Sequence, residues 1–213
     1  KILNLNNNFN LIKTNPFKNL FFLNDLYFKN LKENLVHKFK IENINTIKNI
    51  EMDNINLLKP RWNKFFENNK NVNKLLLTNC KINMSIINYH YLKEVDFSSS
   101  NIYWSSDKAF FQNNLVLSIL KLSNLTINNS LLDSHLNLKN FSKLYHLDLS
   151  INHIEYFRDN FFDNFQQLRF LNISFNYIKS ISFDYFRSFT FFYLDMSFNE
   201  LSHINFSYNT IYK

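Results

Sequence analysis

A repeat with a period of about 24 residues is the feature that most constrains this chain of 213 residues. Three segments in its last third share one pattern. An apolar anchor residue is followed by apolar residues at plus three and plus five, Asn at plus eight and an aliphatic residue at plus ten. The segments are LYHLDLSINHI from Leu144, LRFLNISFNYI from Leu168 and FFYLDMSFNEL from Phe191. Such a period indicates stacked structural units, because one unit is too small to bury its own apolar side.

The same frame extends back toward the start of the chain. The anchors are Leu23, Ile47, Val72, Leu92, Leu117, Leu144, Leu168 and Phe191, and each repeat is named here by its anchor. Successive anchors lie 20 to 27 residues apart, with a mean of 24. Leu3 and Leu5 fit an earlier, truncated repeat. Most anchors are preceded by apolar residues at minus three and minus six, although Asn69 and Asn114 interrupt this lead-in.

The spacing within a repeat predicts a short strand followed by a sharp turn. Residues at plus three and plus five, such as Leu147 and Leu149, point to one side of a strand, and Asp148 between them points to the other. Asn suits the turn because it tolerates left-handed backbone and its amide can satisfy turn backbone groups. Stacked repeats would place Asn152, Asn176 and Asn199 in a hydrogen-bonded ladder. The preceding Phe residues would form an aromatic column on the opposite side.

This pattern resembles the leucine-rich repeat, whose form is L-x-x-L-x-L-x-x-N/C-x-L. The Phe lead-in resembles the typical extracellular class of animals, as in Toll-like receptors, and residues 147–167 match it most closely. The resemblance implies an α/β-type solenoid, a horseshoe with short parallel concave strands and a mostly irregular convex side. We expect residues 1–213 to form a single array of eight to nine repeats. Cys80 stands at plus eight, where the family accepts Cys, and is expected to be a buried ladder residue.

Catalytic and metal chemistry find little support in this sequence. The chain has no Gly, which excludes Gly-rich phosphate loops, dinucleotide fingerprints and the G-x-S-x-G motif. Its one Cys excludes an internal disulfide framework and any multi-cysteine zinc site. His135, His146 and His153 lack the spacing of a zinc motif. We therefore expect no enzyme, no catalytic residue, no metal and no cofactor.

The basic balance of the chain does not by itself indicate nucleic acid. The formal net charge is +7, and the surplus lies in the first half, but no Arg cluster occurs there. Asn, Lys, Ile, Phe, Leu and Tyr dominate the composition, which is typical of an AT-rich gene. A Lys-rich surface could suit an acidic partner, or it could reflect this nucleotide bias alone.

The concave face is the expected binding surface. Residues at plus one, two, four, six and seven would line it. The candidate ligand-binding residues are Tyr145, His146, Asp148, Arg169, Asn172, Phe175, Tyr193, Asp195 and Phe198. Aromatic residues beside alternating charges suit a protein interface. In the alternative interpretation, the plus-seven residues Ile151, Phe175 and Phe198 pack only on the adjacent ladder.

Six N-x-S/T sequons occur, a number that a chain so rich in Asn produces by chance. The glycosylation candidates are Asn83, Asn124, Asn128, Asn140 and Asn205. The sixth, Asn172, would place a glycan on the concave face, and we expect it to be unused. No signal peptide or membrane-spanning run occurs.

The resemblance implies a receptor ectodomain of Toll-like type that binds a protein or microbial ligand. A receptor dimer is one assembly it allows, with membrane contact only through segments absent from this chain. It implies an extracellular or cell-membrane location. An intracellular scaffold or an adhesion protein is the alternative function, with the cytoplasm as the alternative location. The chain begins within one repeat, ends within another and has no Cys-rich caps, so we expect a fragment.

One stability prediction follows from the strand pattern. Asp148 is expected to point into solvent, so Asp148→Ala should change the free energy of unfolding by less than about 0.5 kcal/mol. Chemical denaturation of the two chains measures this difference. A loss of several kcal/mol would contradict the expected environment of Asp148.

Overall fold

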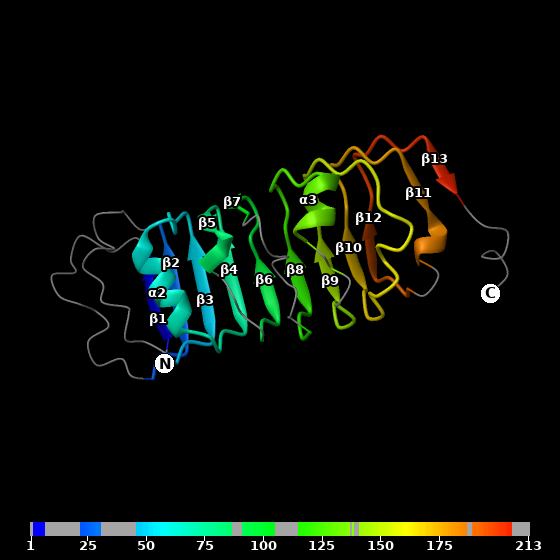
Figure 1. Ribbon diagram of the computed structural model, residues 1–213. Coiled ribbons are helices and arrows are strands. Elements are labelled where there is room, and N and C mark those ends of the chain that lie inside the picture. The colour runs from blue at the N-terminus through cyan, green and yellow to red at the C-terminus, as the bar shows by residue number, and fades with distance from the viewer. Residues whose placement is uncertain are drawn as a thin grey trace. The chain divides into compact units, whose positions relative to one another are not determined.

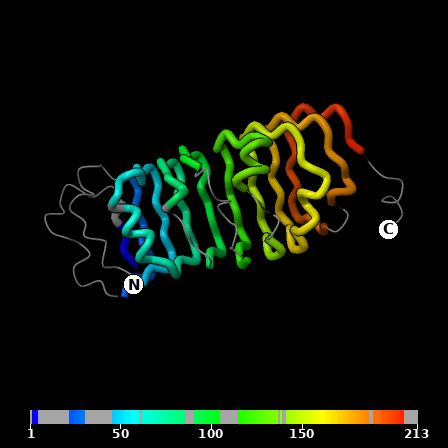
Figure 2. The backbone as a smooth tube through the Cα atoms, viewed as in Figure 1, coloured from blue at the N-terminus to red at the C-terminus, as the bar shows by residue number. Residues whose placement is uncertain are grey.

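The computed structural model describes residues 2–6, 22–30, 46–86, 91–104, 115–136, 138, 141–186 and 189–205. The chain divides into two compact units, Lys1–Asp107 (unit 1) and Lys108–Lys213 (unit 2). Within each unit the backbone winds in successive turns, and each turn contributes one short strand (Figures 1 and 2). Asn114, which interrupts one lead-in, and the sequon residue Asn140 lie outside the described residues.

Unit 1 contains a parallel sheet whose strands follow the order of the sequence. Its strands are β1 (Ile2–Asn6), β2 (Asp25–Lys29), β3 (Asn49–Asp53), β4 (Lys74–Thr78) and β6 (Glu94–Asp96). Helix α2 (Pro60–Asn68) and the 3₁₀ turn η3 (Met84–Ile86) lie on return segments, and β5 (Lys81–Asn83) pairs with β7 (Asn101–Tyr103). Leu3 pairs in register with Leu26, as expected for a truncated first repeat.

Unit 2 repeats the same plan. Its parallel sheet contains β8 (Ile119–Lys121), β9 (His146–Asp148), β10 (Phe170–Asn172) and β12 (Tyr193–Asp195). Its return segments carry α3 (Asn129–Ser134) and the 3₁₀ turn η5 (Phe183–Phe186), and β11 (Ser180–Ser182) pairs with β13 (His203–Asn205). Equivalent positions of successive repeats lie side by side, since Leu147 pairs in register with Leu120 and Leu171.

The strand positions and the alternation of burial agree with the repeat pattern. The eight anchored strands all begin two residues after their anchors. Leu147 and Leu149 are fully buried, and Asp148 between them is partly exposed. The return segments of unit 2 hold the expected aromatic column, in which Phe162, Phe165 and Phe186 are buried against one another. Burial of these large rings adds apolar area to the core of the unit.

The buried residue Asn69 replaces an apolar lead-in residue without loss of hydrogen bonding. Its Oδ1 accepts from the Ile47 amide at 3.4 Å, and its Nδ2 donates to the Phe65 carbonyl at 2.9 Å. The side chain therefore links α2 to the preceding repeat. The interruption of the apolar pattern at this place is consequently a polar connection between neighbours.

The ladder of Asn side chains at plus eight is confirmed in unit 2. Asn152 is 3% exposed, and its Nδ2 donates to three carbonyls, those of Leu122, Leu149 and Ser150. Its Oδ1 accepts from the backbone amides of Leu125 and Ile127, both at 3.0 Å. Asn176 and Asn199 repeat this arrangement. The amides thus connect the backbones of neighbouring repeats rather than bonding to one another.

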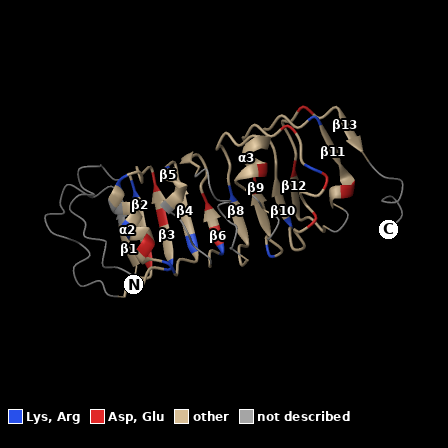
Figure 3. Cartoon of the chain, viewed as in Figure 1, with Lys and Arg blue, Asp and Glu red and all other residues tan. Residues whose placement is uncertain are grey.

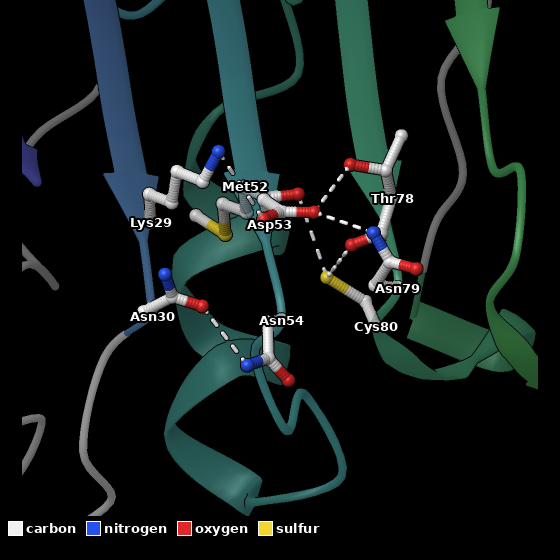
Figure 4. Close-up of polar contacts among 8 residues, drawn as sticks. All are labelled: Lys29, Asn30, Met52, Asp53, Asn54, Thr78, Asn79 and Cys80. Carbon is white, nitrogen blue, oxygen red and sulfur yellow. Dashed lines mark hydrogen bonds and ion pairs between the residues drawn. The ribbon is translucent and has the colours of Figure 1, made fainter.

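Cys80 occupies the ladder position in unit 1, as expected. Its Sγ lies 3.5 Å from the Met52 carbonyl oxygen and 3.2 Å from that of Thr78 (Figure 4). Ser100 takes the same place in the next repeat, where its hydroxyl donates to the Leu77 carbonyl at 2.6 Å. Burial raises the pKa of the Cys80 thiol to about 12, so the thiol stays protonated and unreactive at neutral pH.

The left-handed residue of each turn lies at plus seven, not at plus eight, which corrects the role expected for the ladder Asn. Eight of the nine described residues with positive φ occupy plus seven, and Thr126 is the ninth. Four repeats place Asn there, for which this conformation is cheap: Asn30, Asn54, Asn79 and Asn124. Three repeats of unit 2 place Ile151, Phe175 and Phe198 there, each with φ of 54°. A β-branched or bulky side chain is strained in this region.

The environment of Asp148 corrects the sequence expectation about its contribution to stability. Its Oδ1 accepts from both the backbone amide and the hydroxyl of Ser150, at 2.9 and 2.7 Å. Asn172 and Asp195 form the same pair of bonds with the serine two residues on. The residue at plus four therefore helps to close the turn, so Asp148→Ala should cost about 1–3 kcal/mol. Asp148→Asn should be nearly neutral, because Asn172 makes the same contacts.

A second prediction concerns the strained turns. Ile151→Asn should raise the free energy of unfolding by about 0.5–1 kcal/mol. Asn adopts the left-handed backbone with less strain than Ile, and the substitution removes only the contacts of a side chain that is half exposed. The reverse change, Asn124→Ile at the equivalent position, should lower it by about 1 kcal/mol. Urea unfolding followed by circular dichroism measures both. Equal stability of all three chains would show that the plus-seven backbone is not left-handed.

Candidate functional site

The exposed sheet face is the surface formed by residues at plus one, two, four, six and seven of the repeats. The sequence candidates all lie on this face in unit 2, on β9, β10 and β12 and the residues flanking these strands. The sheet register places His146, Phe170 and Tyr193 in one row, and Asp148, Asn172 and Asp195 in another. The rows arise because each repeat presents the same position to the same edge of its neighbour.

An aromatic cluster covers the start of these strands. The ring of Phe170 stacks on His146 at 5.7 Å and on Tyr193 at 6.4 Å between centroids. Phe170 also meets Tyr145 at 5.2 Å and Phe192 at 6.0 Å. The aromatic cluster is these five residues. Phe192 is 74% exposed and Tyr193 is 46% exposed, so the cluster presents ring surface to solvent.

Sequence analysis missed two members of the aromatic cluster, Phe170 and Phe192. Both occupy face positions, at plus two and plus one of their repeats. Aligning the repeats by anchor places Phe170 in the column of His146 and Tyr193, and this is the signal that identifies it. Phe170 is central to the cluster, since it contacts all four other rings.

A second apolar row lies at plus seven, at the other end of the strands. Ile151 and Phe175 are each 50% exposed, and Phe198 is 70% exposed. The rings of Phe175 and Phe198 stack with centroids 4.2 Å apart and planes 11° apart. The stack contributes some packing within the row, yet each side chain keeps at least half of its surface in solvent. Exposed, strained apolar residues are unfavourable for folding alone and mark a binding surface more often than a core.

The polar row between the two apolar rows is organised by hydrogen bonds. Tyr193 Oη donates to Asp195 Oδ2 at 3.1 Å, while Ser197 donates its hydroxyl and its amide to Asp195 Oδ1. The hydrogen bonds from Ser197 lower the pKa of Asp195, so this carboxylate is ionised at neutral pH. The bond to Asp195 raises the pKa of Tyr193. Arg169 Nη1 donates to the Leu168 carbonyl at 2.9 Å.

The same face in unit 1 is polar. Lys, Asp and Glu residues occur on β3, β4 and β6 (Figure 3). Lys74 Nζ lies 3.0 Å from Glu94 Oε2, and Lys29 Nζ lies 3.9 Å from Asp53 Oδ2. Asp53 Oδ1 also accepts from Thr78 Oγ1 and Asn79 Nδ2 (Figure 4). These groups satisfy one another, in contrast to the exposed rings of unit 2.

The sequons occupy different surfaces. Asn128 is exposed and caps α3, where its Oδ1 accepts from the Leu131 amide, and Asn205 is exposed at the end of β13. Asn124 is exposed at plus seven. Asn83 Oδ1 accepts from the Ser85 amide and hydroxyl.

The sequon at Asn172 lies within β10, in the polar row of the exposed sheet face. Its Oδ1 accepts from Ser174, the third residue of its own sequon, and Ser174 is buried.

Neither a metal-binding cluster nor a membrane-spanning helix occurs in the described part of the chain. No group of three His, Cys, Asp or Glu side chains there could hold a metal ion, and none of its helices is long and apolar enough to span a membrane.

Comparison with known proteins agrees with this architecture. Residues 142–201 match the family model described as Leucine rich repeat. Among curated proteins, none matches the sequence significantly. The match identifies leucine-rich repeats in residues 142–201, and the parallel strands stacked in sequence order and the Asn ladder give the chain the leucine-rich repeat solenoid fold.

Solved structures share this fold at low sequence identity. The mouse RP105/MD-1 complex matches with a TM-score of 0.57 and 18% identity, over 89% of this chain and 36% of that one. The leucine-rich repeat domain of APL1B matches with a TM-score of 0.54 and 20% identity, over 90% and 60%. The plant peptide hormone receptor RGFR1 in complex with RGF2 matches with a TM-score of 0.53 and 14% identity, over 87% and 30%. The chain thus spans less than two thirds of each of these proteins.

Proposed function

We propose that this chain is a non-enzymatic binding module that docks a protein or microbial ligand on the exposed sheet face of unit 2. The observation that carries the proposal is the solvent-exposed aromatic cluster centred on Phe170. Protein interfaces are rich in Tyr and Phe because rigid rings bury much area at little entropic cost. The described part of unit 1 shows no comparable aromatic cluster on this face, where charged groups are largely engaged with one another.

The finer proposal is a cell-surface receptor ectodomain of Toll-like type. Its support is the Phe lead-in of the repeats and the fold shared with RP105, solved with MD-1, and with RGFR1, solved with RGF2. In that setting the exposed sequons at Asn124, Asn128 and Asn205 would carry glycans, with Asn83. Asn172 would stay unmodified, because its side chain is held by Ser174 on the binding face. Membrane attachment and receptor pairing would come from segments outside this chain.

A selection experiment tests the binding role. The chain is secreted from animal cells behind a signal peptide, immobilised, and used to select random dodecapeptides displayed on phage. Phe192→Ser and Phe170→Ser should weaken binding of the selected peptides by about tenfold, because removing an interface aromatic costs about 1–2 kcal/mol. Tyr27→Ser, the matched aromatic change on the face of unit 1, should leave binding unchanged.

The same preparation tests the location. Mass spectrometry of its glycopeptides should find glycans at Asn128 and Asn205 and none at Asn172. Peptides that bind the two Phe variants as well as the parent chain would contradict the binding face. Failure of the chain to leave the cells folded would contradict the receptor ectodomain and support the intracellular scaffold.

A further inference from the structure

Carboxylates on the exposed sheet face differ between the two units. In unit 1, Asp53 and Glu94 each lie within 4 Å of a lysine ammonium. In unit 2, neither Asp148 nor Asp195 forms an ion pair with any residue that the structure describes. Both carboxylates are instead held by serine donors through one oxygen. Unit 2 therefore presents ordered negative charge that the described chain does not neutralise by contact.

Asp195 has the more distinctive surroundings of the two. Its own repeat places Phe192 and Tyr193 before it on the same face and Phe198 after it at plus seven. All three rings are exposed by 46% or more. Two bonds from Ser197 fix Oδ1, and the Tyr193 hydroxyl donates to Oδ2. The carboxylate is thus oriented, ionised and flanked along the strand by aromatic residues.

None of the cationic side chains that the structure describes forms an ion pair with Asp195. Lys121 is aligned in register with Asp148, and Asp148 and Asp195 are separated in the row by the neutral Asn172. Arg169 turns its guanidinium to the Leu168 carbonyl, at 2.9 Å. The local charge at the β12 end of the row is therefore negative, and a partner complementary to it carries positive charge there.

We propose that the repeat anchored at Phe191 recognises a basic side chain, Arg or Lys, on a protein partner, with Asp195 as its counter-ion. An Arg or Lys head group takes a carboxylate oxygen as acceptor, while its alkyl stem and charge lie favourably against aromatic rings. Phe192, Tyr193 and Phe198 supply those rings. The inference rests on the proposed binding role of this face and names the chemistry of the partner.

The turn geometry supplies a variant that removes the charge alone. Asn172 occupies the position equivalent to Asp195 and accepts the same two bonds from its serine, at 3.1 and 2.7 Å. Asp195→Asn should therefore keep the turn closed and the chain folded. Asp96→Asn is the matched control, since Asp96 takes the same plus-four position in unit 1, where its Oδ1 accepts from the Ser98 amide at 2.9 Å.

The test uses the full chain and the phage-displayed dodecapeptide library described above. Peptides enriched on the parent chain should carry Arg or Lys beside an aliphatic or aromatic residue. Their affinity for Asp195→Asn, measured by fluorescence polarisation with synthetic peptides at low salt, should fall about three- to tenfold. Affinity for Asp96→Asn should stay equal to that for the parent chain. Replacing the peptide's basic residue with Gln should remove the difference between the parent chain and Asp195→Asn.

The outcomes separate this inference from the proposed function. Peptides that lose affinity for Phe170→Ser but bind Asp195→Asn unchanged would overturn the basic-partner inference and leave the binding face standing. Enrichment of acidic or uncharged peptides would overturn it likewise. Peptides indifferent to both variants would overturn both proposals.

Discussion

The last three repeats of unit 2 each depend on one side-chain amide at plus eight, those of Asn152, Asn176 and Asn199. The chain reverses sharply after every strand, and this leaves backbone carbonyls and amides turned into the interior, where an unpaired polar group costs about 1–3 kcal/mol. Asn152 and Asn176 supply donors to three carbonyls each and acceptors to amides of a neighbouring repeat. A repeat is therefore stabilised through its neighbours, as expected for a solenoid. In unit 1, Cys80 and Ser100 make fewer such bonds.

The left-handed residue at plus seven explains how a chain without Gly makes these turns. Asn takes the position in four repeats, including three of unit 1, where the face is polar and the charged groups pair with one another. In the last three repeats of unit 2, plus seven is occupied by Ile151, Phe175 and Phe198, whose backbones are strained and whose side chains are exposed. Folding alone favours Asn at these places. The apolar substitutions and the aromatic cluster occur on the same face, which is why unit 2 is the stronger candidate for binding.

The repeat period predicts the fold because burial is periodic. The anchor residue and the residues at plus three and plus five are buried in nearly every repeat. The ladder role of Asn176 and the burial of Cys80 are predictable for the same reason. The position of the left-handed residue is not, because Asn recurs at both plus seven and plus eight, and its side chain suits either role. The bonds of Asp148 to Ser150 depend on the turn geometry, which spacing does not specify. Phe170 emerges only when the repeats are aligned by anchor, which places it in the column of His146 and Tyr193.

Backbone amide exchange is the most direct measure of the ladder. The amides of Ile154 and Ile178 lie outside any strand, and they donate to the Oδ1 atoms of Asn176 and Asn199, at 3.0 and 3.1 Å. If these side chains connect the repeats, both amides exchange as slowly as the Leu149 amide, which bonds to the next strand at 2.8 Å. Exchange at the rate of an unstructured peptide, with the Leu149 amide still protected, would contradict the ladder as the basis of the stack.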